Sequence, residues 1–140
     1  MNKTRRTRIL IDYGKATAIT MAEFIKEKYS IEMISEPTEA LTMIKVRESA
    51  QNSLFYLGEV LVTETKVRVA GKLGIGLVKG HETDLSLALA IIDAAYSADL
   101  PETEKWQVLL EELERAGEDA IAHRIQQSAR TKVNFETMNQ

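Results

Sequence analysis

Cysteine is absent from this 140-residue chain, and its absence removes several kinds of chemistry. A protein without cysteine has no disulfide framework, no thiolate nucleophile and no cysteine-based zinc or iron-sulfur site. Histidine is scarce as well, since His81 and His123 are the only two. Their spacing does not resemble a metal-binding motif, so we expect no metal site.

An excess of positive charge is also missing. Lys and Arg total 18 against 21 Asp and Glu, which gives a formal net charge of -3. Because nucleic-acid-binding domains usually carry a basic surface, we expect no nucleic-acid partner. Long apolar runs are absent too: segment 85–96 is too short to cross a bilayer, and the N-terminus lacks the apolar core of a signal peptide. We therefore expect no membrane contact and a cytoplasmic location.

The clearest pattern that is present indicates a β-hairpin within residues 55–80. Residues 61–69 alternate, which predicts a strand with one buried face. That face carries Leu61, Thr63, Thr65, Val67 and Val69. The second arm places Leu73, Ile75 and Leu77 on one face and Gly74 and Gly76 on the other, and Gly71 suits the turn between the arms. For the glycine strip, close helix packing or a bulge is favoured over a ligand surface.

Helices and further strands are predicted around the hairpin. Apolar residues recur at helical spacing over 16–29, and a second helix over 83–98 takes Thr83 as its N-cap. Asp93 in that helix is either a paired surface carboxylate or a buried acid with a task. A strand over 31–35 is expected to end at Pro37. A further strand over 38–48 and a loop over 49–53 complete this part.

The two ends of the chain are predicted from charge and from helix signals. Residues 1–15 read as a short helix or a mobile arm with four cations, which either contact phosphate or an acidic partner or are simply solvated. The cations are Lys3, Arg5, Arg6 and Arg8. Pro101 opens a C-terminal helix that Gly117 is expected to end, and Ile121 and Ile125 indicate another. Residues 131–138 have an extended character.

Together these patterns predict an α+β fold in one domain over residues 1–140. A small, mostly antiparallel sheet surrounds the central hairpin, and the helices at 16–29 and 83–98 pack on it. A C-terminal helical arm and an extended tail follow. The unpaired tail and the glycine strip also predict that the isolated chain self-associates.

One loop is a candidate anion site. Lys79, Gly80 and His81 lie between the second hairpin arm and the start of a helix, where backbone N-H groups and positive charge favour an anion. One reading of the chain is therefore a free-standing anion-binding module that uses residues 79–83. An exposed loop histidine beside an ordinary helix cap is the competing structural reading. A stand-alone hydrolase is a third possibility, without a recognisable nucleophile motif.

Four stretches of the chain resemble the PhnG subunit family of the bacterial carbon-phosphorus lyase core complex, which belongs to phosphonate metabolism. They are 56–63 (YLGEVLVT), 74–80 (GIGLVKG), 91–94 (IIDA) and 132–138 (KVNFETM). Their order and spacing fit the family over nearly the whole chain. The last stretch is close to the family's pattern V-D-F-x-T-M.

The resemblance implies a subunit that acts with PhnH, PhnI, PhnJ and PhnL. Their shared reaction replaces the adenine of MgATP by an alkylphosphonate and gives a ribose 1-alkylphosphonate 5-triphosphate. In this picture MgATP is a substrate of the complex, and this chain carries no cofactor and supports PhnI. The catalytic residues stay unknown.

The resemblance also implies surfaces that meet partner subunits. Gly58 and Glu59 in the first hairpin arm are candidates, and residues 132–140 form a candidate partner-binding tail. The tail residues with this predicted role are Val133, Phe135, Thr137 and Met138. Their alternation suits addition as a strand or a wedge into a partner groove.

Overall fold

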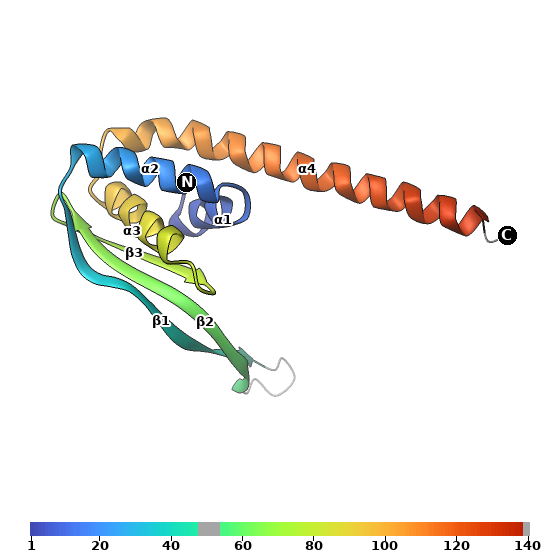
Figure 1. Ribbon diagram of the computed structural model, residues 1–140, viewed down its shortest axis with the longest axis horizontal. Helices are drawn as coiled ribbons and strands as arrows, with labels where there is room; N and C mark the ends of the chain where they lie inside the picture. The colour runs from blue at the N-terminus through green and yellow to red at the C-terminus, as the bar shows by residue number, and fades with distance from the viewer. Residues whose placement is uncertain (48–53, 139–140) are drawn as a thin grey trace. The chain divides into compact units, whose positions relative to one another are not determined.

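The computed structural model describes residues 1–47 and 54–138, with side chains described for 1–45 and 57–129. The elements are α1 (Lys3–Tyr13), α2 (Lys15–Lys28), β1 (Ile31–Arg47), β2 (Leu54–Val69), β3 (Lys72–Lys79), α3 (Thr83–Ser97) and α4 (Glu102–Met138) (Figure 1). The chain divides into two compact units, residues 1–14 with 105–140 (unit 1) and residues 15–104 (unit 2). The predicted α+β class is confirmed, whereas the extent of one domain over 1–140 stays a prediction.

Unit 2 contains an antiparallel sheet with the strand order β1-β2-β3. The predicted hairpin is the β2-β3 pair, in which Val69 faces Lys72 and Val62 faces Lys79. Ala70 and Gly71 make the two-residue turn, with φ of 50° and 78°. Positive φ at both positions matches the right-handed twist of the strands, and glycine adopts it readily.

β1 is one long strand, so the predicted break at Pro37 is wrong. The strand runs from Ile31 to Arg47 and shifts register between Ser35 and Thr38, on either side of the proline. β1 lies at the edge of the sheet, where a residue without a backbone N-H is tolerated at a bulge. The loop predicted at 49–53 lies outside the described residues.

α3 lies on one face of the sheet and α2 packs against α3 (Figure 1). The predicted packing of α2 directly on the sheet is therefore replaced by a stack of sheet, α3 and α2. A Cβ at Gly74 would clash with the backbone of Ala90 and Ala94, and one at Gly76 with the backbone of Ser86 and Ala90. Close helix packing thus explains the glycine strip, as the sequence favoured. The strip is covered, so it gives no support to self-association.

The buried face of the hairpin follows the prediction on β2 but differs at one residue. Thr63, Thr65, Val67 and Val69 are all 0% exposed, whereas Leu61 is 38% exposed. On β3 the buried face is that of Gly74, Gly76 and Val78. Leu73 and Leu77 point away from the helices and are 45% and 49% exposed. The sheet accordingly has apolar side chains on both faces.

α1 opens unit 1, so the N-terminal segment is the short helix of the two predicted alternatives. Asn2 caps the helix, since its Oδ1 accepts a hydrogen bond from the Arg5 amide at 2.8 Å. The guanidinium of Arg5 binds Glu114 through Nη2 at 2.6 Å, and Arg8 lies 3.5 Å from the same carboxylate. Arg6 is buried. Two of the four cations therefore serve an ion pair within unit 1.

α4 is a single helix, so the prediction that Gly117 ends it is wrong. The helix continues from Glu102 to Met138, and no proline follows Pro101. A Cβ at Gly117 would meet the ring of Tyr13, so glycine serves the contact between α4 and α1 rather than a helix end. Residues 121–138, read from sequence as a further helix and an extended tail, have helical backbone throughout. None of the described helices combines the length and apolar character that a membrane crossing requires.

Because Glu114 pairs with Arg5 and Arg8, we expect the stability of the protein to depend on pH. The hydrogen bond from Arg5 is the main cause that holds the pKa of Glu114 below its ordinary value of 4.5. A carboxylate with a depressed pKa stabilises the fold above its unfolded pKa, and this contribution is lost as the pH falls through the folded pKa. We expect Glu114→Gln to lower the unfolding temperature at pH 7, and the difference from the parent protein to shrink below about pH 4.5.

Thermal unfolding followed by circular dichroism from pH 7 to pH 3 measures this difference. Glu112→Gln is the matched control, because Glu112 lies on the same helix, is exposed and has no ion pair among the described residues. Equal pH profiles for the two variants would contradict the assignment.

Candidate functional site

The loop that follows β3 holds the three predicted anion-binding residues. Gly80 has a φ of +87° and turns the chain out of the sheet. Its amide donates to the carbonyl oxygen of Leu61 at 2.7 Å, and its carbonyl oxygen accepts from Thr63 Oγ1 at 2.6 Å. Both polar backbone groups of Gly80 are therefore hydrogen-bonded to β2.

A buried strand side chain caps α3. The sequence predicted Thr83 as the N-cap, but the cap position is Glu82, whose side chain makes no capping hydrogen bond. The amide of Glu82 instead donates to Thr63 Oγ1 at 3.2 Å. Because Thr63 and Glu82 are 19 residues apart, no local sequence signal indicates this pairing. Thr63 thus fixes both the loop and the start of the helix.

Ser86 ties the first turns of α3 to the two strands beneath it. Its hydroxyl lies 2.8 Å from Thr65 Oγ1 and 2.9 Å from the carbonyl oxygen of Gly76, and all of the Ser86 side chain is buried. A hydroxyl donates one hydrogen bond at a time and can accept others, so these groups satisfy one another. The network holds the loop and α3 in register.

Two basic side chains at the loop, His81 and Lys15, contact carboxylates. His81 Nδ1 contacts Glu39 of β1, and Lys15 of α2 lies 3.3 Å from Glu82. A hollow of about 320 Å³ lies beside these pairs. It is lined by Lys15, Ile19, His81, Glu82, Thr83, Asp84 and Leu85. An anion here would meet the carboxylates of Glu39 and Glu82, and the anion-binding role of Lys79, Gly80 and His81 stays a prediction.

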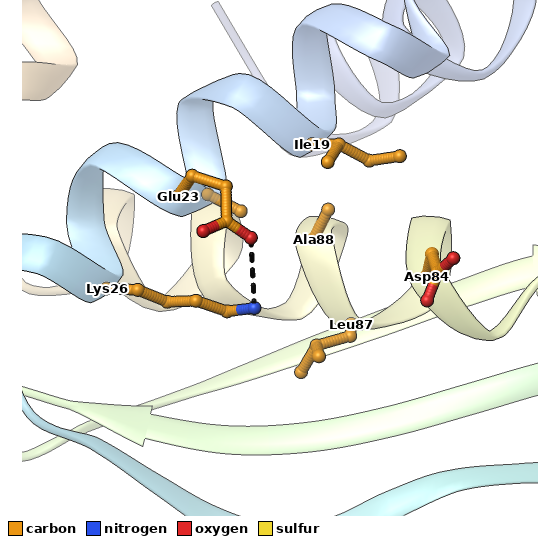
Figure 2. A pocket seen from close by; sticks show the side chains of 7 residues that line it. Ile19, Glu23, Lys26, Asp84, Leu87 and Ala88 are labelled. Atoms are coloured by element: carbon orange, nitrogen blue, oxygen red, sulfur yellow. Dashed lines mark hydrogen bonds and ion pairs between the residues drawn. The ribbon is translucent and has the colours of Figure 1, made fainter.

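A second hollow of about 260 Å³ lies between α2 and α3 (Figure 2). Ile19, Glu23 and Lys26 come from α2, and Asp84, Leu87 and Ala88 from α3. Lys26 Nζ is 3.4 Å from the Glu23 carboxylate, an i,i+3 pair on one helix. Among the side chains that the structure describes, those of residues 1–45 and 57–129, no three acidic or histidine side chains are grouped as a metal ion requires.

Gly58 and Glu59, the predicted partner residues of the hairpin, lie outside the helix-covered part of the sheet. Gly58 faces Ile44, next to a register shift between Ile44 and Lys45, and a Cβ there would meet nothing within 4 Å. Leu41 and Met43 of β1 are 64% and 52% exposed in the same region. This part of the sheet forms an uncovered two-stranded ribbon.

The predicted tail residues end α4. The backbone of Val133, Phe135, Thr137 and Met138 is helical, while Asn139 and Gln140 lie outside the described residues. A helix has no free backbone edge, so strand addition by this segment would require it to unwind. Its partner-binding role stays a prediction.

Of the two predicted alternatives for Asp93, the structure shows a carboxylate with a hydrogen-bond partner. Its Oδ2 accepts a hydrogen bond from the Ile75 amide at 2.9 Å, which links α3 to β3. Ile75 lies between the two glycines on which α3 packs. Two of the four stretches noted in the sequence, 74–80 and 91–94, thus meet across one helix-strand contact.

The family model described as phosphonate metabolism protein PhnG matches residues 1–140, which is the whole chain. No curated protein matches the sequence.

Proposed function

Because the chain belongs to the PhnG family of phosphonate metabolism proteins, we propose that it is a subunit of the carbon-phosphorus lyase core complex. The complex that we propose contains PhnH, PhnI and PhnJ and acts with PhnL in the cytoplasm. The match over all 140 residues is the observation that carries the proposal. The uncovered ribbon of β1 and β2 supports a role as a subunit, because exposed apolar strands are typical of surfaces that a partner covers.

The proposed reaction displaces adenine from MgATP by an alkylphosphonate. A phosphonate oxygen forms a bond to C1′ of the ribose, and the bond from C1′ to N9 breaks, so that its electron pair leaves with adenine, which takes up a proton. The product is ribose 1-alkylphosphonate 5-triphosphate. Such a displacement needs stabilisation of positive charge at C1′, help for the departing base and cations around the triphosphate.

We assign this chain a supporting role toward PhnI rather than the supply of catalytic groups. In the candidate site the ionisable side chains engage one another: His81 with Glu39, and Lys15 with Glu82. Thr63 and Ser86 are buried and serve the packing of α3. The alternative of a free-standing anion-binding module has less support, because His81 of its loop contacts the Glu39 carboxylate.

Co-purification tests the proposed assembly. The tagged chain is co-expressed with PhnH, PhnI and PhnJ, and we expect the three to elute with it in fixed proportion from size-exclusion chromatography. The tagged chain expressed with an unrelated soluble protein is the control for nonspecific capture. Elution of the chain apart from all three would refute the assembly.

A further inference from the structure

β2 continues well beyond the end of β3. β3 pairs with residues 62–69 of β2, whereas β2 begins at Leu54. In the described part of unit 2, residues 54–61 have β1 as their only strand neighbour. Figure 1 shows this ribbon of β1 and β2 running on past the tip of β3. Beside residues 57–61 of β2, no described strand occupies the position that a longer β3 would take. We call this position the step.

Backbone groups of β2 point into this step. The carbonyl oxygen of Leu61 accepts from the Gly80 amide, so the backbone polar groups of Leu61 are directed to the β3 side. Successive residues of a strand alternate in this direction, which turns the N-H and C=O of Glu59 the same way. Val60 is directed to β1, where it faces Thr42. Glu59 thus presents a donor and an acceptor at the position that a continued β3 would occupy.

The outer edges of the sheet carry features that hinder strand addition along much of their length. On the free edge of β3, Asp93 accepts from the Ile75 amide. On the free edge of β1, Pro37 and two register shifts interrupt the strand. Carboxylates, prolines and bulges at such positions are ordinary means of preventing strand addition. Residues 58–61 pair with β1 without a register shift, contain no proline and carry one charged side chain, that of Glu59; the register shift beside Leu57 lies at the far end of the step.

The ribbon beside the step is apolar on both faces. Leu41 faces Leu61, and both lie on the side of the buried Thr63, where they are 64% and 38% exposed. Ile44 lies on the opposite side and is 39% exposed. Val60 and Val62, also on that opposite side, are half-buried. Strands that are apolar on both faces belong inside a protein, covered from two sides.

We propose that an extended segment of a different protein chain adds to β2 at residues 57–61 and continues the line of β3. The segment is apolar on both faces and carries a lysine or arginine close to Glu59. A second copy of this chain fits poorly, because a two-fold pairing about Glu59 would set two carboxylates side by side. This contact would be the means by which the proposed subunit joins its complex, and it rests on the proposed function only for the identity of the partner.

Two substitutions at Glu59 separate the backbone from the side chain. Glu59→Pro removes the N-H that points into the step and leaves the hydrogen bonds to β1 in place. Glu59→Ala removes the carboxylate together with the rest of the side chain beyond Cβ and keeps the backbone N-H. In co-expression with PhnH, PhnI and PhnJ, we expect Glu59→Pro to lower the recovered complex at least tenfold and Glu59→Ala about threefold. An unchanged unfolding temperature of the isolated Glu59→Pro chain shows that it is folded, and equal yields for the two variants would overturn the proposal.

A second experiment tests strand addition at residues 57–61 without those subunits. It applies also if the parent chain captures none of them. The probe is a synthetic decapeptide of valine, isoleucine and threonine with one central lysine, at millimolar concentration. Amide exchange followed by NMR is expected to slow at least fivefold at Glu59 and not at Val60, whose N-H already faces β1. The absence of slowing at Glu59 would overturn the proposal. Failure of co-purification combined with slowing at Glu59 would refute the proposed function alone.

Discussion

The Gly76→Ala variant is expected to be about 3 kcal/mol less stable than the parent protein, at the upper end for overpacking. The added methyl group would overlap the carbonyl oxygen of Ser86 and lie 2.6 Å from the amide nitrogen of Ala90. Both atoms belong to the backbone of α3, so no side-chain rotation relieves the clash. α3 would have to move away from the sheet and weaken the hydrogen bond from Ser86 to the Gly76 carbonyl.

Gly58→Ala is the matched control for this prediction. It makes the same chemical change in the neighbouring strand, where a Cβ has nothing within 4 Å. We expect its free energy of unfolding in urea to stay within about 0.5 kcal/mol of the parent value, as for an ordinary surface position. If Gly76→Ala were as stable as Gly58→Ala, the close approach of α3 to β3 would be wrong.

The Asp93→Ala variant is expected to lose about 2 kcal/mol, because a hydrogen bond to a charged group is removed. The lost bond joins the Asp93 carboxylate to the Ile75 amide, in the part of β3 where α3 packs on glycine. The substitution also removes the carboxylate from the free edge of β3. We therefore expect the variant to self-associate more strongly in sedimentation velocity at high concentration.

Asp93→Asn distinguishes the hydrogen bond from the charge. The asparagine side-chain oxygen still accepts from the Ile75 amide, so this variant should keep most of the stability in urea unfolding. It lacks the negative charge and should self-associate to an intermediate degree. Equal stability of Asp93→Ala and the parent protein would contradict the role given to this carboxylate.

The sequence predicted the elements whose signals are local. The alternation over 61–69 and the turn residue Gly71 give the β2-β3 hairpin, and the apolar spacing over 16–29 gives α2. The ends of elements that were predicted from a single proline or glycine were wrong. Pro37 sits at a bulge of an edge strand, and Gly117 meets the Tyr13 ring, so neither residue ends its element.

The candidate site was less accessible to sequence reasoning, because its contacts join residues far apart in the chain. His81 pairs with Glu39 across 42 positions, and Lys15 with Glu82 across 67. The buried hydroxyl of Thr63 replaces a local helix cap. Nothing in the spacing of these residues marks them as neighbours. Family resemblance therefore identified the chain where the local patterns indicated only its fold class.

Adenine release measured with and without this chain shows whether the chain takes part in the proposed reaction. PhnH, PhnI, PhnJ and PhnL are assayed with MgATP and methylphosphonate in the presence and the absence of this chain, with matched amounts of the other subunits. We expect adenine release that depends on methylphosphonate and falls at least tenfold when the chain is omitted. Equal rates with and without the chain would contradict the claim that it is a working subunit of this complex.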